Sequence, residues 1–239
     1  MWDNYTIYGF IMLPKKLHYI WIGNSKTELA NKCIESYYKF MSDYEIIEWN
    51  ESNISSLNLD GIYKQYYDFW YDRGLFAFCT DIARMFILEQ HGGIYIDCDV
   101  EFIKHLPDSY IEKPIISRLT PKDTVNTGCI WGCEKHDPFT INLINTIRNK
   151  LETDGHNYKR TWVQNTVVLH MFNSVMTDNN TKNICQCNGY NVYPAEYFCP
   201  INMFTGENNI TDKTISIHHF ALSWQKYNPH WKLLVKELH

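Results

Sequence analysis

Residues 75–101 read LFAFCTDIARMFILEQHGGIYIDCDVE, and the rest of the chain can be interpreted outward from this stretch. Apolar side chains recur at helical spacing over its first half, which predicts a helix with one buried face. Thr80, Asp81 and Arg84 share another face of that helix, because residues three and four apart are neighbours on a helix. The helix is therefore expected to present two charged groups and a hydroxyl together.

Two glycines, Gly92 and Gly93, follow the helical pattern and are expected to end it, because glycine adopts the left-handed backbone of a helix terminus. A short β-rich run, Ile94–Ile96, comes next, and Asp97 and Asp99 follow it. Alternate side chains of an extended chain point the same way, so both carboxylates are expected on one side of the strand end.

Two carboxylates so placed repel each other unless positive charge lies between them, and a divalent cation with oxygen ligands meets that need. Such a cation usually carries diphosphate oxygens as well, because proteins rarely enclose it completely. A D-x-D pair alone is more often a solvated turn or strand end. Here the apolar strand, the glycine pair and the charged helix face together favour a metal site.

The bulk composition narrows the class of protein. The 239 residues suffice for one large domain or two small ones, and 45% hydrophobic residues support a sizeable core. A net charge of −5 gives no electrostatic reason to expect nucleic acid as a partner. No run of eighteen apolar residues predicts a membrane span, and residues 7–13 are too short and lack the basic start of a signal peptide.

The eight cysteines are scattered, which favours reduced thiols and a cytoplasmic location, with at most peripheral association with a membrane surface. Cys185 and Cys187, and Cys129 and Cys133, are the close pairs, and they lack the suitably spaced histidines of a zinc site.

Strand-like and helix-like segments alternate along the chain, which predicts an α/β fold with an open mixed sheet flanked by helices. Residues 52–74 are rich in aromatic side chains and are expected to form a small helical subdomain over the site. No linker divides the chain, so a single domain over residues 1–239 is expected. The expected strands are 13–23, 44–49, 94–96, 115–117, 129–132 and 215–219, with a strand and loop over 100–106 and a strand, turn and tail over 190–200. The main expected helices are 28–40, 75–91, 138–151 and 161–172.

At this point the sequence resembles the small glycosyltransferases with a DxD motif, of the family 32 type. This group includes relatives of the yeast initiation mannosyltransferase, capsular polysaccharide transferases and, more remotely, the clostridial glucosylating toxins. Their pattern is a Ser-Asp-x-x-Arg helix followed by Gly-Gly-x-Tyr-x-Asp-x-Asp, with Thr80 here in place of the serine. The matching residues are Thr80, Asp81, Arg84, Gly92, Gly93, Tyr95, Asp97 and Asp99.

The resemblance extends along the chain and implies a GT-A-like fold. Pro14–Gly23 matches P-K-x-x-H-x-x-W-x-G, Trp49–Glu51 matches W-N-E, and Pro194–Pro200 matches P-x-x-Y/F-F-x-P. Family members tend to carry Gly-Pro where this chain has Arg160-Thr161-Trp162, a departure that affects the acceptor loop more than the donor site.

The resemblance also implies roles for individual residues. The expected catalytic residues are Asp81, Arg84, Asp97 and Asp99; the expected metal ligands are Asp97, Asp99 and His218 or His219; the expected substrate-binding residues are Ile20, Trp21, Asn50, Thr80, Tyr95, Asn126, Gly128, Ser223 and Trp224. Asn50 follows a strand, where an asparagine is more often a turn former, and Asn126–Gly128 is explained equally well as an ordinary turn. Trp21, likewise, has an alternative role as a core side chain.

The implied reaction is metal-dependent, retaining transfer of a sugar from a nucleoside diphosphate to a hydroxyl of a glycan or lipid-linked glycan, with Mn²⁺ or Mg²⁺ as cofactor. A UDP-sugar is the favoured donor, and GDP-mannose is the alternative. Two other classes stay open. A haloacid-dehalogenase-like phosphatase also places D-x-D after an apolar strand, but near the N-terminus and with a later acidic pair. A non-catalytic sugar-binding protein would account for the aromatic content.

Overall fold

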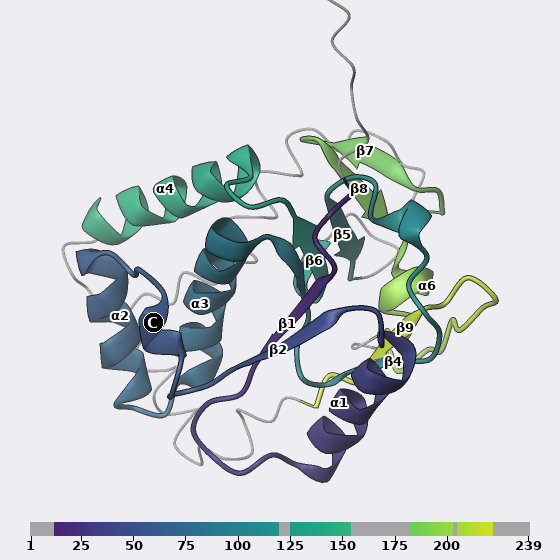
Figure 1. Cartoon of the computed structure of the whole chain (residues 1–239), viewed down its shortest axis with the longest axis horizontal. Helices are drawn as coiled ribbons and strands as arrows, with labels where there is room; N and C mark the ends of the chain where they lie inside the picture. The colour runs from purple at the N-terminus through teal and green to yellow at the C-terminus, as the bar shows by residue number, and fades with distance from the viewer. Residues whose placement is uncertain (1–11, 120–124, 154–181, 203–204, 222–239) are drawn as a thin grey trace, which may run out of the picture.

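The computed structural model describes residues 12–119, 125–153, 182–202 and 205–221. These residues form a seven-stranded mixed sheet with helices on both faces and a separate two-stranded sheet (Figure 1). The expected helix 161–172 lies outside the described residues. The single domain over residues 1–239 stays a prediction.

The large sheet has the strand order β2-β1-β3-β6-β5-β8-β7. Its parallel part pairs β1 with β2 and with β3, so that Leu17 lies opposite Ile94 and His18 opposite Tyr95. β6 then runs antiparallel to both β3 and β5, and β8 runs parallel to β5. The strands are β1 Lys16–Ile20, β2 Glu45–Trp49, β3 Gly93–Tyr95, β5 Ile115–Arg118, β6 Val125–Cys133, β7 Cys185–Cys187 and β8 Tyr190–Tyr193.

The helices begin and end where local sequence signals place them. The Thr27 hydroxyl accepts from the Ala30 N–H at the start of α1, and Asp60 caps α2 in the same way. Gly92 ends α3 with φ of 63°, as the sequence predicts, and an added Cβ there would lie 2.6 Å from the Lys135 nitrogen. The helices are α1 Glu28–Phe40, α2 Gly61–Tyr71, α3 Phe76–His91, α4 Pro138–Thr153 and the short α6 Ala195–Phe198, with 3₁₀ turns η1 Ile54–Ser56 and η2 Asp108–Tyr110.

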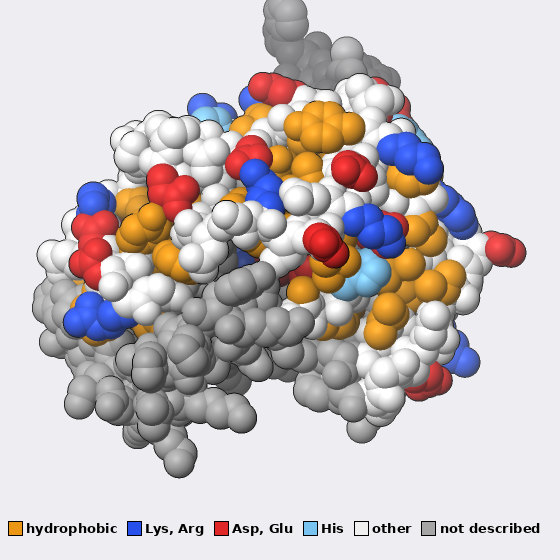
Figure 2. Space-filling view, turned by 90° about the horizontal axis from the view of Figure 1, so that it is seen from below, with side chains coloured by type: hydrophobic (Ala, Val, Ile, Leu, Met, Phe, Trp, Pro, Cys, Tyr) orange, Lys and Arg blue, Asp and Glu red, His pale blue; other side chains and the backbone are white. Residues whose placement is uncertain are grey.

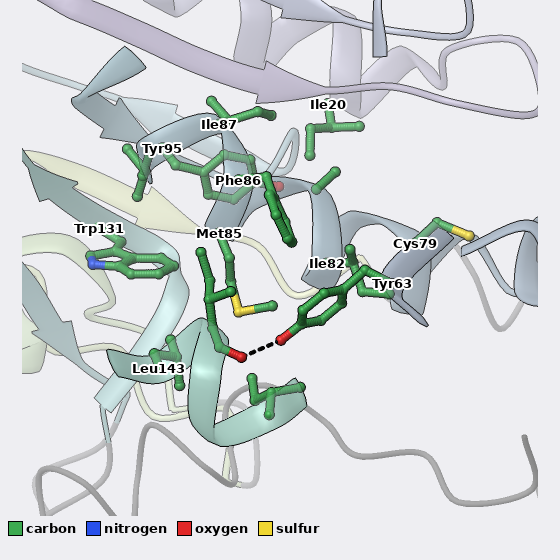
Figure 3. Close-up of a cluster of buried hydrophobic side chains, with 14 of the residues drawn as sticks. Ile20, Tyr63, Cys79, Ile82, Met85, Phe86, Ile87, Tyr95, Trp131 and Leu143 are labelled. Carbon is green, nitrogen blue, oxygen red and sulfur yellow. Dashed lines mark hydrogen bonds between the residues drawn. The ribbon is translucent and has the colours of Figure 1, made fainter. Parts of the chain in front are cut away.

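The sheet separates two hydrophobic cores. Helices α2, α3 and α4 gather on one face, and α1 lies on the other side near the two-stranded sheet (Figure 1). Side chains alternate along β3. Tyr95 therefore lies in the core on the side of α2, α3 and α4 (the first core), and Ile94 lies in the core on the side of α1 (the second core). In the first core Met85, Phe86 and Tyr95 pack near Trp131, and the Tyr63 hydroxyl donates to the Ile144 carbonyl at 2.6 Å (Figure 3). Burial of both faces of the central strands explains their continuous apolar sequence.

Two elements differ from the sequence expectation. The expected strand 100–106 is only β4, Val100–Phe102, and it leaves the main sheet to pair antiparallel with β9, Ser216–His218. The register places Val100 opposite His218, which carries the histidine to the residues next to the D-x-D pair. Strand β7 and helix α6 were not expected at all.

Figure 2 shows acidic and basic side chains beside one another on the face it presents, instead of a patch of one sign. Ion pairs among the described residues include Lys26 with Glu48 and Lys32 with Glu101. In the described part of the chain, no helix combines the length and apolar character needed to cross a membrane.

Candidate active site

The D-x-D pair lies in a tight turn directly after β3. The Val100 N–H donates to the Asp97 carbonyl at 3.1 Å, so residues 97–100 turn back instead of continuing as a strand. The sequence predicted that both carboxylates face one way because the chain is extended there. That reason is wrong, because the chain turns at these residues. The turn nevertheless brings oxygens of Asp97 and Asp99 and a nitrogen of His218 within 4.8 Å of one another.

Arg84 holds two of the predicted catalytic carboxylates. Its Nη2 lies 3.1 Å from Asp81 Oδ1 and 3.2 Å from Asp97 Oδ1. Its side chain is 5% exposed, and its guanidinium carbon lies 4.8 Å from the centre of the Tyr95 ring. Nη1 donates to the Thr127 hydroxyl at 3.3 Å. Because one nitrogen, Nη2, contacts both aspartates, Arg84 fixes the distance between the helix and the D-x-D turn.

Asp97 is positioned by contacts on several sides. The Tyr95 hydroxyl donates to Asp97 Oδ1 at 3.0 Å, and the Asp97 N–H donates to the Gly128 carbonyl at 2.9 Å. A Cβ at Gly128 would lie 2.0 Å from Asp97 Oδ2, so only glycine leaves room for this carboxylate. Tyr95 is buried, and its hydroxyl donates to Asp97. This contact explains why the motif has a tyrosine here without requiring that Tyr95 contact the substrate.

Asp99 is tied to the end of β9. His218 Nε2 lies 3.1 Å from Asp99 Oδ1, and the Ala221 N–H donates to Asp99 Oδ2 at 2.8 Å. Burial alone would raise the pKa of Asp99, but the facing imidazolium lowers it; Asp99 in turn raises the pKa of His218 against the effect of burial. The two groups therefore form an ion pair in the metal-free protein.

The structure distinguishes the two histidines that the sequence left equivalent. His218 points to Asp99, whereas the ring of His219 lies 2.8 Å from Glu101. His219 contacts the turn only through its backbone N–H, which donates to the Asp99 carbonyl at 2.9 Å. The side chain of His219 is thus not brought to the D-x-D pair, and His218 is the histidine that fits a ligand role.

Asp81 is a buried carboxylate beside this cluster. Burial raises the pKa of Asp81 to about 6, the charge of Arg84 acts against this rise, and Asp97 adds to it. The side chain is 13% exposed, so it is accessible at one edge.

Ile20 ends β1 beside the D-x-D turn, and Trp21 follows the strand. The Cys98 thiol lies 2.9 Å from the Ile20 carbonyl, which joins the two segments. Trp21 is half-buried, and its indole N–H donates to the Asn24 carbonyl at 2.5 Å. Asn50 follows the neighbouring strand, but its side-chain oxygen accepts from the Ser52 N–H at 2.9 Å, which is the turn-forming arrangement.

The remaining expected substrate residues have local structural contacts. The Thr80 hydroxyl donates to the Ala77 carbonyl at 2.8 Å and lies 3.4 Å from Arg84 Nη2. Asn126 Oδ1 accepts from the Gly128 N–H at 2.6 Å, which shapes the segment that passes over Asp97. Ser223 and Trp224, and the 160–162 segment, lie outside the described residues.

The donor set formed by Asp97, Asp99 and His218 suits a hard or borderline divalent cation. Two carboxylates supply oxygen, the imidazole supplies nitrogen, and Mn²⁺ and Mg²⁺ accept such ligands while retaining open positions for phosphate oxygens. The side chains of Asp97 and Asp99 are 30% and 20% exposed, which leaves a solvent-facing side for those positions.

Three functional neighbours were not expected from the sequence. Thr127 binds Arg84, and Cys129 and Cys199 lie against the far side of His218. The Cys129 hydrogen bond lowers the pKa of the Cys199 thiol to about 6, against the effect of burial and with a further contribution from His218. Positions so distant in sequence carry no local spacing signal, so only the fold reveals them.

Comparison with known proteins finds similarity to sugar-transferring enzymes. Residues 27–118 match the family model described as a glycosyltransferase sugar-binding region containing a DXD motif. An uncharacterized glycosyltransferase, L373, of Acanthamoeba polyphaga mimivirus is 24% identical over 234 residues, which is 93% of this chain and 86% of that protein.

Inositol phosphoceramide mannosyltransferase 3 of Schizosaccharomyces pombe is 26% identical over 149 residues. That match covers 60% of this chain but only 40% of the yeast enzyme. Among solved structures, the PaToxG glycosyltransferase has a TM-score of 0.52 at 18% identity and covers 69% of this chain and 70% of that one. This likeness confirms the GT-A-like fold class.

Proposed function

We propose that this chain is a metal-dependent glycosyltransferase, which transfers a sugar from a nucleoside diphosphate to a hydroxyl of a glycan or lipid-linked glycan; the match to a glycosyltransferase sugar-binding region containing a DXD motif supports this proposal. The observation that carries the proposal is the convergence of Asp97, Asp99 and His218 within 4.8 Å, although His218 comes from β9 and lies far along the chain from the D-x-D turn that follows β3.

Asp97, Asp99 and His218 would hold the cation. When bound, a Mn²⁺ or Mg²⁺ ion supplies positive charge to the diphosphate as it leaves. The protein's own part is to keep the ligands in place before the donor arrives. Arg84 and Tyr95 hold Asp97, and His218 and the Ala221 N–H hold Asp99. Prior positioning of this kind lowers the cost of organising the site during the reaction.

Asp81 is proposed to bind hydroxyl groups of the donor sugar. An ionised carboxylate accepts hydrogen bonds at both oxygens, and Arg84 keeps this one 3.1 Å from its Nη2, next to the D-x-D turn. Ile20 and Trp21 lie beside the same turn and are proposed to border the base. Arg84 is proposed to act mainly by positioning the two aspartates.

Retention of the anomeric configuration is proposed, by departure and attack on the same face of the sugar. Asp81, the carboxylate nearest the D-x-D turn on α3, is occupied by Arg84, so it is a poor nucleophile for a covalent intermediate. A donor phosphate oxygen would then accept the proton of the attacking hydroxyl, which balances the transfer without a protein base.

The donor is proposed to be a UDP-sugar, with GDP-mannose as the second candidate. The second candidate is supported by the mannosyltransferase name of the Schizosaccharomyces pombe relative, and that name also makes a phosphoinositol lipid a candidate acceptor.

The test is a panel of nucleotide sugars assayed for Mn²⁺-dependent donor hydrolysis. Wild type is expected to hydrolyse one donor with Mn²⁺ and none with a chelator, and Asp99→Asn is expected to be inactive at saturating Mn²⁺. Asp68→Asn, a change at an exposed aspartate paired with Lys64 on α2, is the matched control and should keep full activity. Full activity of Asp99→Asn, or metal-dependent hydrolysis of a simple phosphate ester in place of a nucleotide sugar, would refute the proposal.

A further inference from the structure

The imidazole of His218 lies between two donor sets of different chemistry. Its Nε2 faces Asp99 Oδ1 at 3.1 Å, and its Nδ1 faces the Cys129 sulfur at 3.1 Å. The ligand atoms of Cys129, Cys199 and His218 all lie within 4.8 Å of one another. Cys129 comes from β6, Cys199 from the end of α6 and His218 from β9, so three separate elements converge on this point.

We propose that Cys129, Cys199 and His218 form a second metal site, which binds a soft divalent cation such as Zn²⁺ through two sulfurs and Nδ1. Zn²⁺ prefers cysteine sulfur and histidine nitrogen in tetrahedral geometry, and three protein ligands with one further position are a common arrangement. This site is distinct from the aspartate site, which offers oxygen ligands and the opposite nitrogen of the ring.

The distances fit a zinc ion after a small adjustment. Bonds of about 2.3 Å to sulfur and about 2.0 Å to nitrogen at a tetrahedral centre would separate the sulfur and nitrogen by about 3.5 Å. The Cys129 sulfur and His218 Nδ1 are 3.1 Å apart, so each needs to move by only a few tenths of an ångström, as estimated from those bond lengths. All three residues are buried, and burial protects a metal–thiolate bond from competing water.

The environment of the ring supports the same site. A histidine that binds metal through one nitrogen usually donates its other N–H to a carboxylate, which fixes the ring and increases its basicity. With Zn²⁺ on Nδ1, the proton stays on Nε2, where Asp99 Oδ1 already lies at 3.1 Å. The Ala221 N–H holds the same carboxylate through its other oxygen.

The shared ring makes the two sites compete. A neutral imidazole has one nitrogen lone pair to give, so a cation on Nδ1 places the proton on Nε2 and removes His218 from the aspartate site. A cation at Asp97 and Asp99 that takes Nε2 places the proton on Nδ1, where it donates to sulfur. Occupancy of the thiol site is therefore expected to weaken Mn²⁺ binding at the aspartates.

The experiment is a Co²⁺ titration of the full chain, reduced and metal-free, because Co²⁺ replaces Zn²⁺ and gives a sulfur-to-cobalt charge-transfer absorption only when thiolates bind it. Wild type should show this absorption at one equivalent and lose it when Zn²⁺ is added. Cys129→Ser and Cys199→Ser should each lack it. Cys133→Ser, at a buried thiol on the same strand, is the matched control and should retain it, as should Asp97→Asn.

A second readout measures competition between the sites. Zn²⁺ at one equivalent should weaken Mn²⁺ binding, followed by electron paramagnetic resonance, at least tenfold in wild type and leave it unchanged in Cys129→Ser. This readout uses no nucleotide, so its failure is separable from failure of the proposed transferase activity. Should the serine variants fail to fold, X-ray absorption of Zn²⁺-loaded wild type tests the same point, since sulfur is expected in the inner ligand shell.

Three outcomes would overturn the proposal: Co²⁺ bound without the charge-transfer absorption, an inner shell of only oxygen and nitrogen, or recovery of Cys129 and Cys199 as a disulfide in protein that binds no Co²⁺.

Discussion

Substitution of Gly128 by alanine tests whether the D-x-D turn depends on the strand that passes over it. The ideal Cβ would lie 2.0 Å from Asp97 Oδ2 and 2.7 Å from its Cγ, so the carboxylate must move. That movement breaks the contacts of Asp97 Oδ1 with Arg84 at 3.2 Å and Tyr95 at 3.0 Å. Hydrogen bonds to charged groups contribute about 1.5–3 kcal/mol each, so we expect the loss of these two to lower the free energy of unfolding by about 3–6 kcal/mol.

The displaced carboxylate also leaves the cation site. Calorimetric titration with Mn²⁺ should show at least a tenfold loss of affinity in Gly128→Ala, measured beside chemical unfolding. Gly132→Ala is the matched control: its Cβ would meet the Ile115, Leu13 and Ile94 side chains at 3.0–3.2 Å, so it perturbs core packing on the same strand without touching Asp97. Gly61→Ala, with nothing within 4 Å, controls for the substitution itself. Unchanged Mn²⁺ affinity in Gly128→Ala, or an equal loss in Gly132→Ala, would refute the reasoning.

Three further predictions concern buried charged groups. Burial lowers the pKa of His18 from 6.5 to about 4, so this residue should be neutral in the folded protein. Its contribution to the free energy of unfolding is complete above pH 6.5 and should be lost as the pH falls toward 4, by up to about 3 kcal/mol. Unfolding measured across this range should show a smaller loss in His18→Gln, and an identical profile would contradict the assignment. Burial raises the pKa of Asp81 to about 6, so the affinity for the donor should rise through pH 6 as Asp81 ionises. Binding titrations of Asp81→Asn should lack this rise in affinity. A rise that persists in the variant excludes Asp81 as its source. Arg84→Lys should lower stability by about 3–5 kcal/mol, because the shorter lysine loses the Nη1 contact with Thr127 and does not place its ammonium where Nη2 lies between the two aspartates. Chemical unfolding will show the loss, and a loss under 1 kcal/mol would mean that these contacts contribute little.

The order of elements around the active site could be predicted from local sequence. The apolar spacing of residues 75–91, the glycine pair and the β-rich run each encode their structure within a few residues, and α3, its Gly92 end and β3 match them. The helical spacing of apolar residues over 28–40 likewise gave the bounds of α1 correctly.

The exact geometry at Asp97 and Asp99 could not be predicted in this way. A three-residue motif after a strand fits an extended chain and a turn equally well, and the turn is fixed by long-range contacts with Gly128 and Ala221. Likewise, the choice between His218 and His219 depends on the register between β4 and β9, which places Val100 opposite His218. Period-two alternation puts only one of two adjacent side chains on a given face, but it does not say which one.

The role expected for Arg84 shows the same limit. Its position in the motif implies only a catalytic role, and the fold adds that it is buried between two carboxylates from different elements. The position of the two thiols beside His218 could not be predicted either, because Cys129 and Cys199 come together only through tertiary packing.

The most direct measurement is calorimetric binding of nucleoside diphosphates, UDP and GDP, to wild type and to Asp99→Asn, each with Mn²⁺ and with a chelator. The account predicts that wild type binds one of the two nucleotides at least a hundredfold more tightly with Mn²⁺, and that Asp99→Asn loses this dependence. Equal affinity with and without Mn²⁺ in wild type would contradict the claim that Asp97, Asp99 and His218 hold the cation that receives the diphosphate.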